Sequence, residues 1–224
     1  MNPISKTLVF FILSLGIINL TACSHEADNY PTKGIDISHY QKRIDWKKFK
    51  ENNLEFVLVK ATEGGFYKDS LFQHNWKNLD QLPVVKGAYH FFRPKVAVQQ
   101  QIQNFIEAVD LQSGDLVPVL DIEVTDKVTT DLIVRDIRIW LQYIENHYNA
   151  KPIVYTYKSF YEQHLKGQID NPIWIAYYNR SAATDIPWEF WQYSDNGSIQ
   201  GIDGAVDLNV FFGKKEELQQ YCLP

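Results

Sequence analysis

The sequence predicts an α/β fold, an irregular TIM-like barrel of eight strands. Eight short, β-rich apolar runs follow one another between residues 34 and 210, and continuous apolar runs are typical of strands buried on both faces. About 17 to 28 residues separate the first five runs, and about 10 to 14 separate the last four. A parallel crossover takes a dozen or more residues, usually with a helix. We therefore expect helices early in the chain and none of full length between the last strands.

The predicted strands lie in order along one continuous body. Each is rich in branched or aromatic residues. They cover residues 34–38, 56–61, 84–92, 117–123, 152–157, 172–178, 189–193 and 206–210. No long linker, internal repeat or charge block interrupts them, so we expect one domain over 34–213 and a short tail at 214–224. An open doubly wound sheet with a β extension is the alternative architecture.

Helical spacing of apolar residues appears in the longer gaps. Apolar residues recur every three or four positions over 98–109 and again over 133–144, which places them on one face of a helix. Thr130-Asp131 opens the second segment as a predicted N-cap. Shorter helices are predicted over 45–52 and 70–80.

Composition and charge exclude several classes of protein. Hydrophobic residues make up 45% of the 224 residues and charged residues 22%, which is ordinary for a globular chain and unlike a disordered or collagen-like one. The net charge of −5 argues against broad neutralisation of phosphates, so nucleic acid is not an expected partner. Two cysteines are too few for a fold held by disulfides.

The N-terminal segment has the pattern of a bacterial lipoprotein signal. One lysine precedes an apolar run over 8–20, which falls short of the roughly 20 residues that span a bilayer. The sequence LTAC that follows resembles a lipobox, in which Cys23 becomes the lipid-carrying N-terminus. We therefore predict a signal peptide at 1–22, a polar tether at 23–33, and an exported protein anchored by lipid to a membrane of the bacterial cell envelope.

Two alternatives to this interpretation of the N-terminus stay open. The apolar run also suits a buried helix or an uncleaved anchor. Cys23 and Cys222 are the two cysteines of the chain, and a disulfide between them competes with lipidation of Cys23, which would exclude it.

Carboxylates interrupt or close several predicted strands. In a βα barrel the chemistry sits at the carboxyl ends of the strands, and Asp36, Asp121, Glu123 and Asp207 are expected there. Asp121 and Glu123 lie two residues apart, so their side chains share one face of a strand, with Cα atoms roughly 6–7 Å apart. Neighbouring carboxylates split their pKa values, which gives a general acid beside an ionised partner. Glycosidases use this arrangement; a solvent-facing strand end or a metal site is the alternative.

Other chemistries lack their sequence signals. The six histidines form no H-E-x-x-H or H-x-H pattern, so no metal is expected. The motifs G-x-S-x-G and G-x-G-x-x-G are absent, which argues against a hydroxyl nucleophile and a nucleotide cofactor. No cofactor is predicted, and His39 and His90 are expected to be structural or subsite residues.

Aromatic residues, 14% of the chain, gather in and just beyond the predicted strands. Sugar rings have apolar faces that lie on aromatic side chains, while their hydroxyls bond to polar groups nearby. Side chains alternate along a strand, so Tyr89 and His90 cannot both face the barrel interior. We expect substrate contacts from Tyr89, Phe91, Tyr157, Tyr177 and Gln192.

Eight short motifs run through the body of the chain. They are GIDISHYQ at 34–41, VLVKATEG at 57–64, GAYHFFRP at 87–94, PVLDIE at 118–123, PIVYTY at 152–157, IWIAYY at 173–178, WQYSD at 191–195 and VDLNVF at 206–211. In this order they resemble glycoside hydrolase family 25, the lysozymes also called Chalaropsis-type muramidases. The resemblance implies an irregular barrel of about five βα units and three further strands, in agreement with the gap lengths.

The resemblance also implies an activity and roles for the acids. Members of the family cleave the β-1,4 bond between N-acetylmuramic acid and N-acetylglucosamine, so the glycan strands of peptidoglycan are the expected binding partner. The protein is expected to be a monomer. By motif, Glu123 would be the general acid and Asp121 the second carboxylate. Asp36 and Asp207 would complete the acidic cluster.

The stereochemical route stays open at this point. Carboxyl groups about 5–5.5 Å apart suit a covalent intermediate, and a separation of about 6.5–9.5 Å suits an inverting water. In a third route the 2-acetamido carbonyl of the sugar attacks the anomeric carbon while Asp121 orients the amide, and we favour this retaining route. A catalytically weak peptidoglycan-binding lipoprotein is the alternative function.

Overall fold

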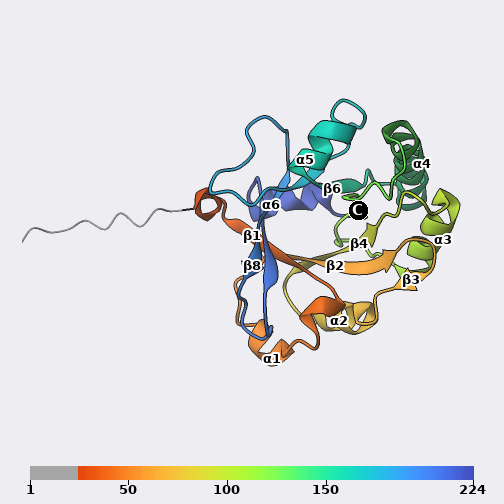
Figure 1. Cartoon of the computed structure of the whole chain (residues 1–224). Coiled ribbons are helices and arrows are strands. Elements are labelled where there is room, and N and C mark those ends of the chain that lie inside the picture. Colours follow the sequence, from red (N-terminus) through yellow and green to blue (C-terminus); the bar gives the residue numbers. More distant parts are fainter. Residues whose placement is uncertain (1–24) are drawn as a thin grey trace, which may run out of the picture.

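The computed structural model describes residues 25–224, in which eight strands close into a barrel (Figure 1). The strand order is β1-β9-β8-β7-β6-β5-β4-β2, and the pairing of β1 with β2 closes the sheet. The barrel strands are β1 (Thr32–Ile37), β2 (Phe56–Glu63), β4 (Val85–Phe91), β5 (Val119–Asp121), β6 (Ile153–Tyr157), β7 (Ile173–Ala176), β8 (Phe190–Gly197) and β9 (Val206–Phe211). The predicted barrel is confirmed, and the open-sheet alternative is wrong. A short ninth strand, β3 (Tyr67–Lys68), which the sequence analysis does not predict, forms a hairpin on β2.

The last strand runs against its neighbours. β1 pairs in parallel with β2, and parallel pairing continues through β4, β5, β6, β7 and β8. β9 is antiparallel to both β8 and β1, so its first residues lie where the other strands end. Asp207 is the second residue of β9. The expectation that it lies at the carboxyl end of its own strand is therefore wrong, although the antiparallel direction brings it to the predicted end of the barrel.

Helices cover the part of the barrel built from the earlier strands (Figure 1). Helices of more than one turn follow β2, β4 and β5, whereas the connections after β7 and β8 contain no helix. The helices are α1 (Trp46–Phe49), α2 (Phe72–Leu79), α3 (Val98–Ala108), α4 (Thr130–Tyr148), α5 (Lys158–Phe160), which continues as a π turn (Tyr161–Leu165), and α6 (Lys215–Leu218). The predicted loss of helices towards the C-terminus is confirmed. The N-cap of α4 is Thr129, one residue before the predicted pair.

The core lies between the barrel wall and these helices. Along β2, the apolar residues from Phe56 to Ala61 are at most 1% exposed, because the strand is covered on both faces. Full burial of a large apolar side chain stabilises a fold by about 1.5–3 kcal/mol. The ring of Phe56 packs directly over Gly34 on β1, where a Cβ atom would overlap it. On the inner face of α4, fully buried apolar residues recur at helical spacing: Ile133, Ile137, Trp140 and Ile144.

Both ends of the described chain pack on the barrel. Residues 26–29 form a 3-10 helix with Ala27 buried, and the ring of His25 lies 5.5 Å from that of Trp191. Residues 25–33 therefore belong to the folded domain and are not a free tether. At the other end, Leu218 is fully buried and Cys222 forms a β-bridge with Leu116, so the tail also completes the domain.

The predicted signal peptide and Cys23 lie outside the described residues. No helix within residues 25–224 is both long and apolar enough to cross a membrane.

Candidate active site

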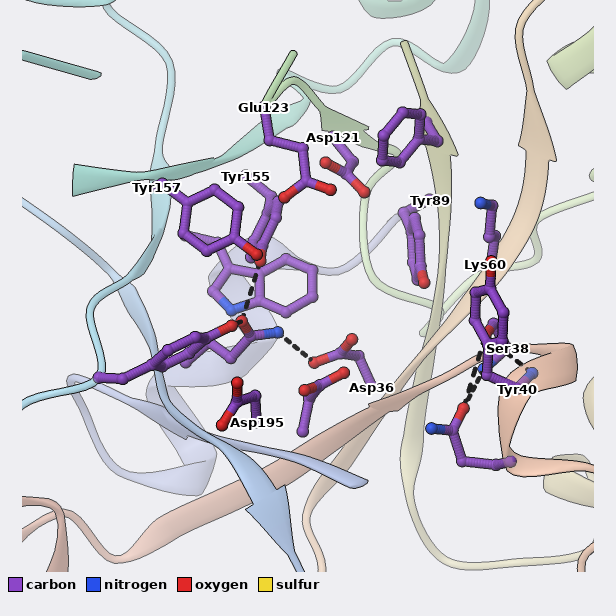
Figure 2. Close-up of a pocket in the computed structure, with 16 residues that line it drawn as sticks. Asp36, Ser38, Tyr40, Lys60, Tyr89, Asp121, Glu123, Tyr155, Tyr157 and Asp195 are labelled. Atoms are coloured by element: carbon purple, nitrogen blue, oxygen red, sulfur yellow. Dashed lines mark hydrogen bonds between the residues drawn. The ribbon is translucent and has the colours of Figure 1, made fainter. Parts of the chain in front are cut away.

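A cavity of about 230 Å³ opens where the parallel strands end (Figure 2). Its lining is strongly acidic, with five carboxylates and one ammonium group among the described residues. The carboxylates belong to Asp36, Asp121, Glu123, Asp195 and Asp207, and the ammonium group is that of Lys60. Like charges in a confined space disfavour ionisation, so some of these acids keep their protons at higher pH than free carboxylates do.

Asp121 and Glu123 lie side by side at one edge of the cavity (Figure 2). Asp121 is the last residue of β5 and is 6% exposed, and its Oδ1 atom has no hydrogen-bond partner within residues 25–224. Burial and the charge of Glu123 hold the pKa of Asp121 well above its usual range. Burial also raises the pKa of Glu123, against a hydrogen bond from Tyr157 that lowers it. The two acids therefore titrate as one unit, and the larger rise falls on the more buried Asp121.

Asp36 and Asp207 form a second pair of acids across the cavity floor. They stand directly opposite each other in the antiparallel pairing of β1 and β9. Burial, and then the charge of Asp207, hold the pKa of Asp36 well above its usual range, while burial raises the pKa of Asp207 to about 6. A hydrogen bond joins the two carboxyl groups, raising the pKa of Asp36 and lowering that of Asp207. These opposite shifts favour the proton on Asp36 over Asp207.

Side-chain amides fix the orientation of Asp36. The Nε2 atom of Gln192 and the Nδ2 atom of Asn209 each donate to Asp36 Oδ2 at 2.8 Å. The Oε1 atom of Gln192 accepts two hydroxyl bonds, from Tyr155 at 2.9 Å and Tyr178 at 2.6 Å. Both the donor and the acceptor of the Gln192 amide group are therefore engaged in placing the acids or the tyrosines around them.

Comparison with known proteins assigns the chain that forms this cavity to a family. The family model for glycosyl hydrolases family 25 matches residues 35–202. The chain belongs to glycosyl hydrolase family 25. YegX from Escherichia coli K12 is 39% identical over 201 residues, covering 86% of this chain and 74% of that protein. "Lysozyme M1" from Streptomyces globisporus is 33% identical over 211 residues, covering 86% of this chain and 71% of the relative.

The solved structures agree with this assignment. A family 25 glycosyl hydrolase from Bacillus anthracis superimposes with a TM-score of 0.82 at 32% identity, covering 89% of this chain and 97% of that one. A bacterial lysozyme from Streptomyces coelicolor gives a TM-score of 0.77 at 29% identity, covering 85% and 96%. The family resemblance of the eight motifs is confirmed, and the chain is a glycosidase by family.

The family 25 barrel brings most of the predicted site residues into one cavity. The four predicted acids line it together with Tyr89, Phe91, Tyr157 and Gln192. Tyr177 is the exception, because it lines only an adjoining groove next to Lys158, which it shares with the cavity residues Tyr157 and Tyr178. Alternation continues past the end of β7, so the cavity side holds Trp174 and Tyr178, and Tyr177 points the other way.

His90 faces away from the cavity, as the alternation with Tyr89 predicts. Its ring is fully buried, stacks on Trp140 at 5.9 Å, and bonds to Thr62 and Gln101. Burial lowers the pKa of His90 to about 4, so the ring stays neutral and structural.

Several residues that line the cavity of this family 25 domain, or support its lining from behind, escape the sequence analysis. Lys60 lies inside an apolar strand, where its ammonium group is paired with Glu63 at 2.7 Å and lies 4.7 Å over the ring of Phe91. Asn209, two residues after Asp207, is fully buried and accepts a bond from Trp174 at 2.8 Å. The two-residue period, extended from Asp207 to its neighbour on the same face, finds Asn209, but no such signal points to Lys60. Ser38 follows the same rule from Asp36, and Tyr155 lies two residues before the predicted Tyr157. Tyr40, Gln41, Trp174, Tyr178 and Asp195 also line the cavity.

Proposed function

We propose that this chain is a lysozyme, an N-acetylmuramidase that hydrolyses the β-1,4 bond between N-acetylmuramic acid and N-acetylglucosamine in peptidoglycan. The observation that carries the proposal is the neighbouring pair Asp121 and Glu123, which faces the proton-sharing pair Asp36 and Asp207 in one cavity. Family membership and relatives named "Lysozyme M1", "Autolytic lysozyme" and "N,O-diacetylmuramidase" support it. Action as a monomer is part of the proposal.

In this proposal Glu123 is the general acid. Its raised pKa favours the protonated form that a general acid requires. The proton passes to the glycosidic oxygen as the bond to the anomeric carbon breaks. Asp207, ionised beside the protonated Asp36, supplies negative charge that stabilises the oxocarbenium-like transition state.

Asp121 is proposed to orient the 2-acetamido group of the sugar. Its Oδ1 atom, which has no partner among the described residues, is suited to accept a hydrogen bond from the amide N–H. That bond favours the ionised form of Asp121, so bound substrate would move the shared proton from Asp121 to Glu123. The acetamido oxygen then attacks the anomeric carbon, and in the second step water, deprotonated by Glu123, opens the resulting ring with net retention.

A turbidity or dye-release assay on purified cell walls tests the proposed function. We expect release of soluble dyed fragments by the wild-type protein. Sedimentation of the protein with the walls without any release would instead support the alternative, a binding lipoprotein with little turnover.

The tyrosine pair after β7 gives a sharp test of which face contacts the glycan. Tyr178 lines the cavity and donates to Gln192, whereas Tyr177 lies outside it. We expect Tyr178→Ala to lower kcat/KM on peptidoglycan roughly 30-fold, because an aromatic contact and a hydrogen bond are each worth about 1 kcal/mol. Tyr177→Ala is the matched control and should stay within about twofold. A larger loss from Tyr177→Ala would place the glycan on the adjoining groove.

Anchoring by lipid at Cys23 is a second part of the proposal. It is supported by the apolar run over 8–20 followed by LTAC, and it would hold the domain at a membrane of the cell envelope. The folded domain begins by residue 26. Lipid at Cys23 would therefore keep the barrel close to the membrane surface and not at the end of a long tether.

Cys23→Ser should abolish incorporation of a fatty-acid analogue in metabolic labelling and leave the precursor or a soluble product. Cys222→Ser is the matched control, since it removes the other cysteine of the chain, and it should keep the label. Equal label in wild type and Cys23→Ser would contradict the anchor.

A further inference from the structure

The residue proposed as the general acid stands at the start of a loop with little backbone support. The amide of Ile122 still donates to Tyr155 on β6 at 3.0 Å. The backbone N–H groups of residues 123–127 donate to no backbone carbonyl of the described chain. The next such bond along the chain runs from Val128 to Thr125. Asp126 and Lys127 also adopt left-handed backbone angles, with φ of 48° and 66°. Such a conformation disfavours residues other than glycine and persists only where the surroundings hold it.

The surroundings hold this loop through one arginine. Arg93 grips the carboxylate of Asp126 with two parallel bonds, Nε to Oδ2 at 2.9 Å and Nη2 to Oδ1 at 2.7 Å. The Asp126 side chain is 9% exposed. Bidentate arginine–carboxylate pairs are stronger and more directional than single ion pairs, so Asp126 is held in both position and orientation.

Arg93 is itself fixed to the barrel. Its backbone N–H donates to Gln101 Oε1 at 2.9 Å, and its carbonyl accepts from Gln101 Nε2 at 3.0 Å. Gln101 is fully buried on α3. The third guanidinium nitrogen donates to Glu63 Oε1 at 3.0 Å, at the end of β2. The guanidinium group thus ties the loop after β5 to the ends of β2 and β4.

The charged residues bonded to Arg93 extend to the cavity, although Arg93 itself does not line it. Glu63 accepts a bond from Lys60 at 2.7 Å, and Lys60 lines the cavity. Arg93 is not among the residues that line it. An effect of Arg93 on turnover must therefore pass through the residues that it holds.

We infer that Arg93 is a positioning residue that holds the loop after β5, through Asp126, so that the carboxyl group of Glu123 meets the glycosidic oxygen. The inference rests on the proposed function and adds a role outside the cavity to it. Misplacement of a catalytic group by about 1 Å costs up to about 100-fold in rate. We therefore expect Arg93→Met and Asp126→Asn each to lower kcat on peptidoglycan by about 10- to 100-fold with little change in KM.

Two matched variants separate this role from a general charge effect. Lys95 also points its ammonium group at Asp126, but at 3.9 Å and with the side chain 61% exposed, so Lys95→Met should stay within about twofold of wild type. Arg93→Lys keeps the charge and loses the two parallel bonds, so it should restore only part of the activity. Asp126→Asn leaves the bond between Arg93 and Glu63 in place and therefore disturbs the barrel less than Arg93→Met does. Near-UV circular dichroism checks that each variant is folded.

The deciding measurement combines each variant with Glu123→Gln and follows product release from peptidoglycan by mass spectrometry. If Arg93 acts through Glu123, the change Arg93→Met or Asp126→Asn costs less than about twofold once the acid is gone. A dinitrophenyl glycoside of the muramyl disaccharide gives a second reading, because its leaving group needs little protonation. First-turnover release of dinitrophenolate, which precedes the step in which Glu123 acts as base, should be near the wild-type rate in both variants.

Three results would overturn the inference. They are losses that multiply in the double variants, equal losses on both substrates, or single variants within twofold of wild type. A wild-type protein that releases nothing from peptidoglycan would instead contradict the proposed function itself.

Discussion

Replacement of Glu123 by glutamine should lower hydrolysis of peptidoglycan at least about 100-fold, because positioned general acids contribute about 10²–10⁴. Glutamine keeps the shape of the side chain but has no proton to give to the leaving oxygen. The fold should persist, since burial already raises the pKa of Glu123 and thus favours a neutral group at this position. Initial rates of dye release, with thermal unfolding as the check on folding, measure both effects.

Glu107→Gln is the control for this variant. Glu107 is exposed near the end of α3, away from the cavity, so its loss should leave the rate unchanged. A Glu123→Gln protein within about tenfold of wild type would show that the proton donor lies elsewhere, and Asp36 or Asp207 would become the candidates.

Asp121→Asn is expected to cost about 100-fold in rate while the variant still binds glycan. The new side-chain amide would present an N–H toward the substrate amide in place of the carboxylate oxygen that has no partner in the described chain, so the acetamido oxygen would no longer be aimed at the anomeric carbon. Binding to insoluble peptidoglycan and initial rates, measured side by side, separate orientation from affinity. Loss of binding in proportion to loss of rate would contradict the orienting role.

The same account predicts retention of configuration. Proton NMR of the first-formed product, recorded before mutarotation, should show the β-anomer. An α-anomer would leave only an inverting water. A glycosyl-enzyme trapped on Asp121 or Asp36 with a fluorosugar would show that a carboxylate, and not the acetamido group, is the nucleophile. Retention would still hold, but substrate assistance would be contradicted.

Strand number and order of elements were accessible from the sequence because buried strands and amphipathic helices leave periodic patterns. The gap lengths also predicted where helices stop, since a helix does not fit the shorter connections. Strand direction was not accessible: a 12-residue gap before β9 permits either direction, and the antiparallel solution appears only in the hydrogen-bond pairing. Residues 25–33 look like a polar tether, yet Ala27 and Tyr30 pack on the barrel.

The acids of the site were accessible because charge inside an apolar strand is costly and therefore conspicuous. The tyrosine after β7 was assigned one residue too early, since nothing local distinguishes Tyr177 from Tyr178 until the face of β7 is known. Lys60 and Arg93 were missed for another reason. Their roles depend on partners three and 33 residues away, Glu63 and Asp126, and spacing of that kind leaves no pattern in one sequence.

The most direct test of the central claim is the identity of the sugar at the reducing end of the products. Peptidoglycan digested with the wild-type protein is reduced with borohydride, and the ends are identified by mass spectrometry. A muramidase leaves N-acetylmuramic acid at the new reducing end, so the account predicts N-acetylmuramitol in wild-type digests and its loss with Glu123→Gln. N-acetylglucosaminitol ends, or anhydromuramic acid, would contradict it.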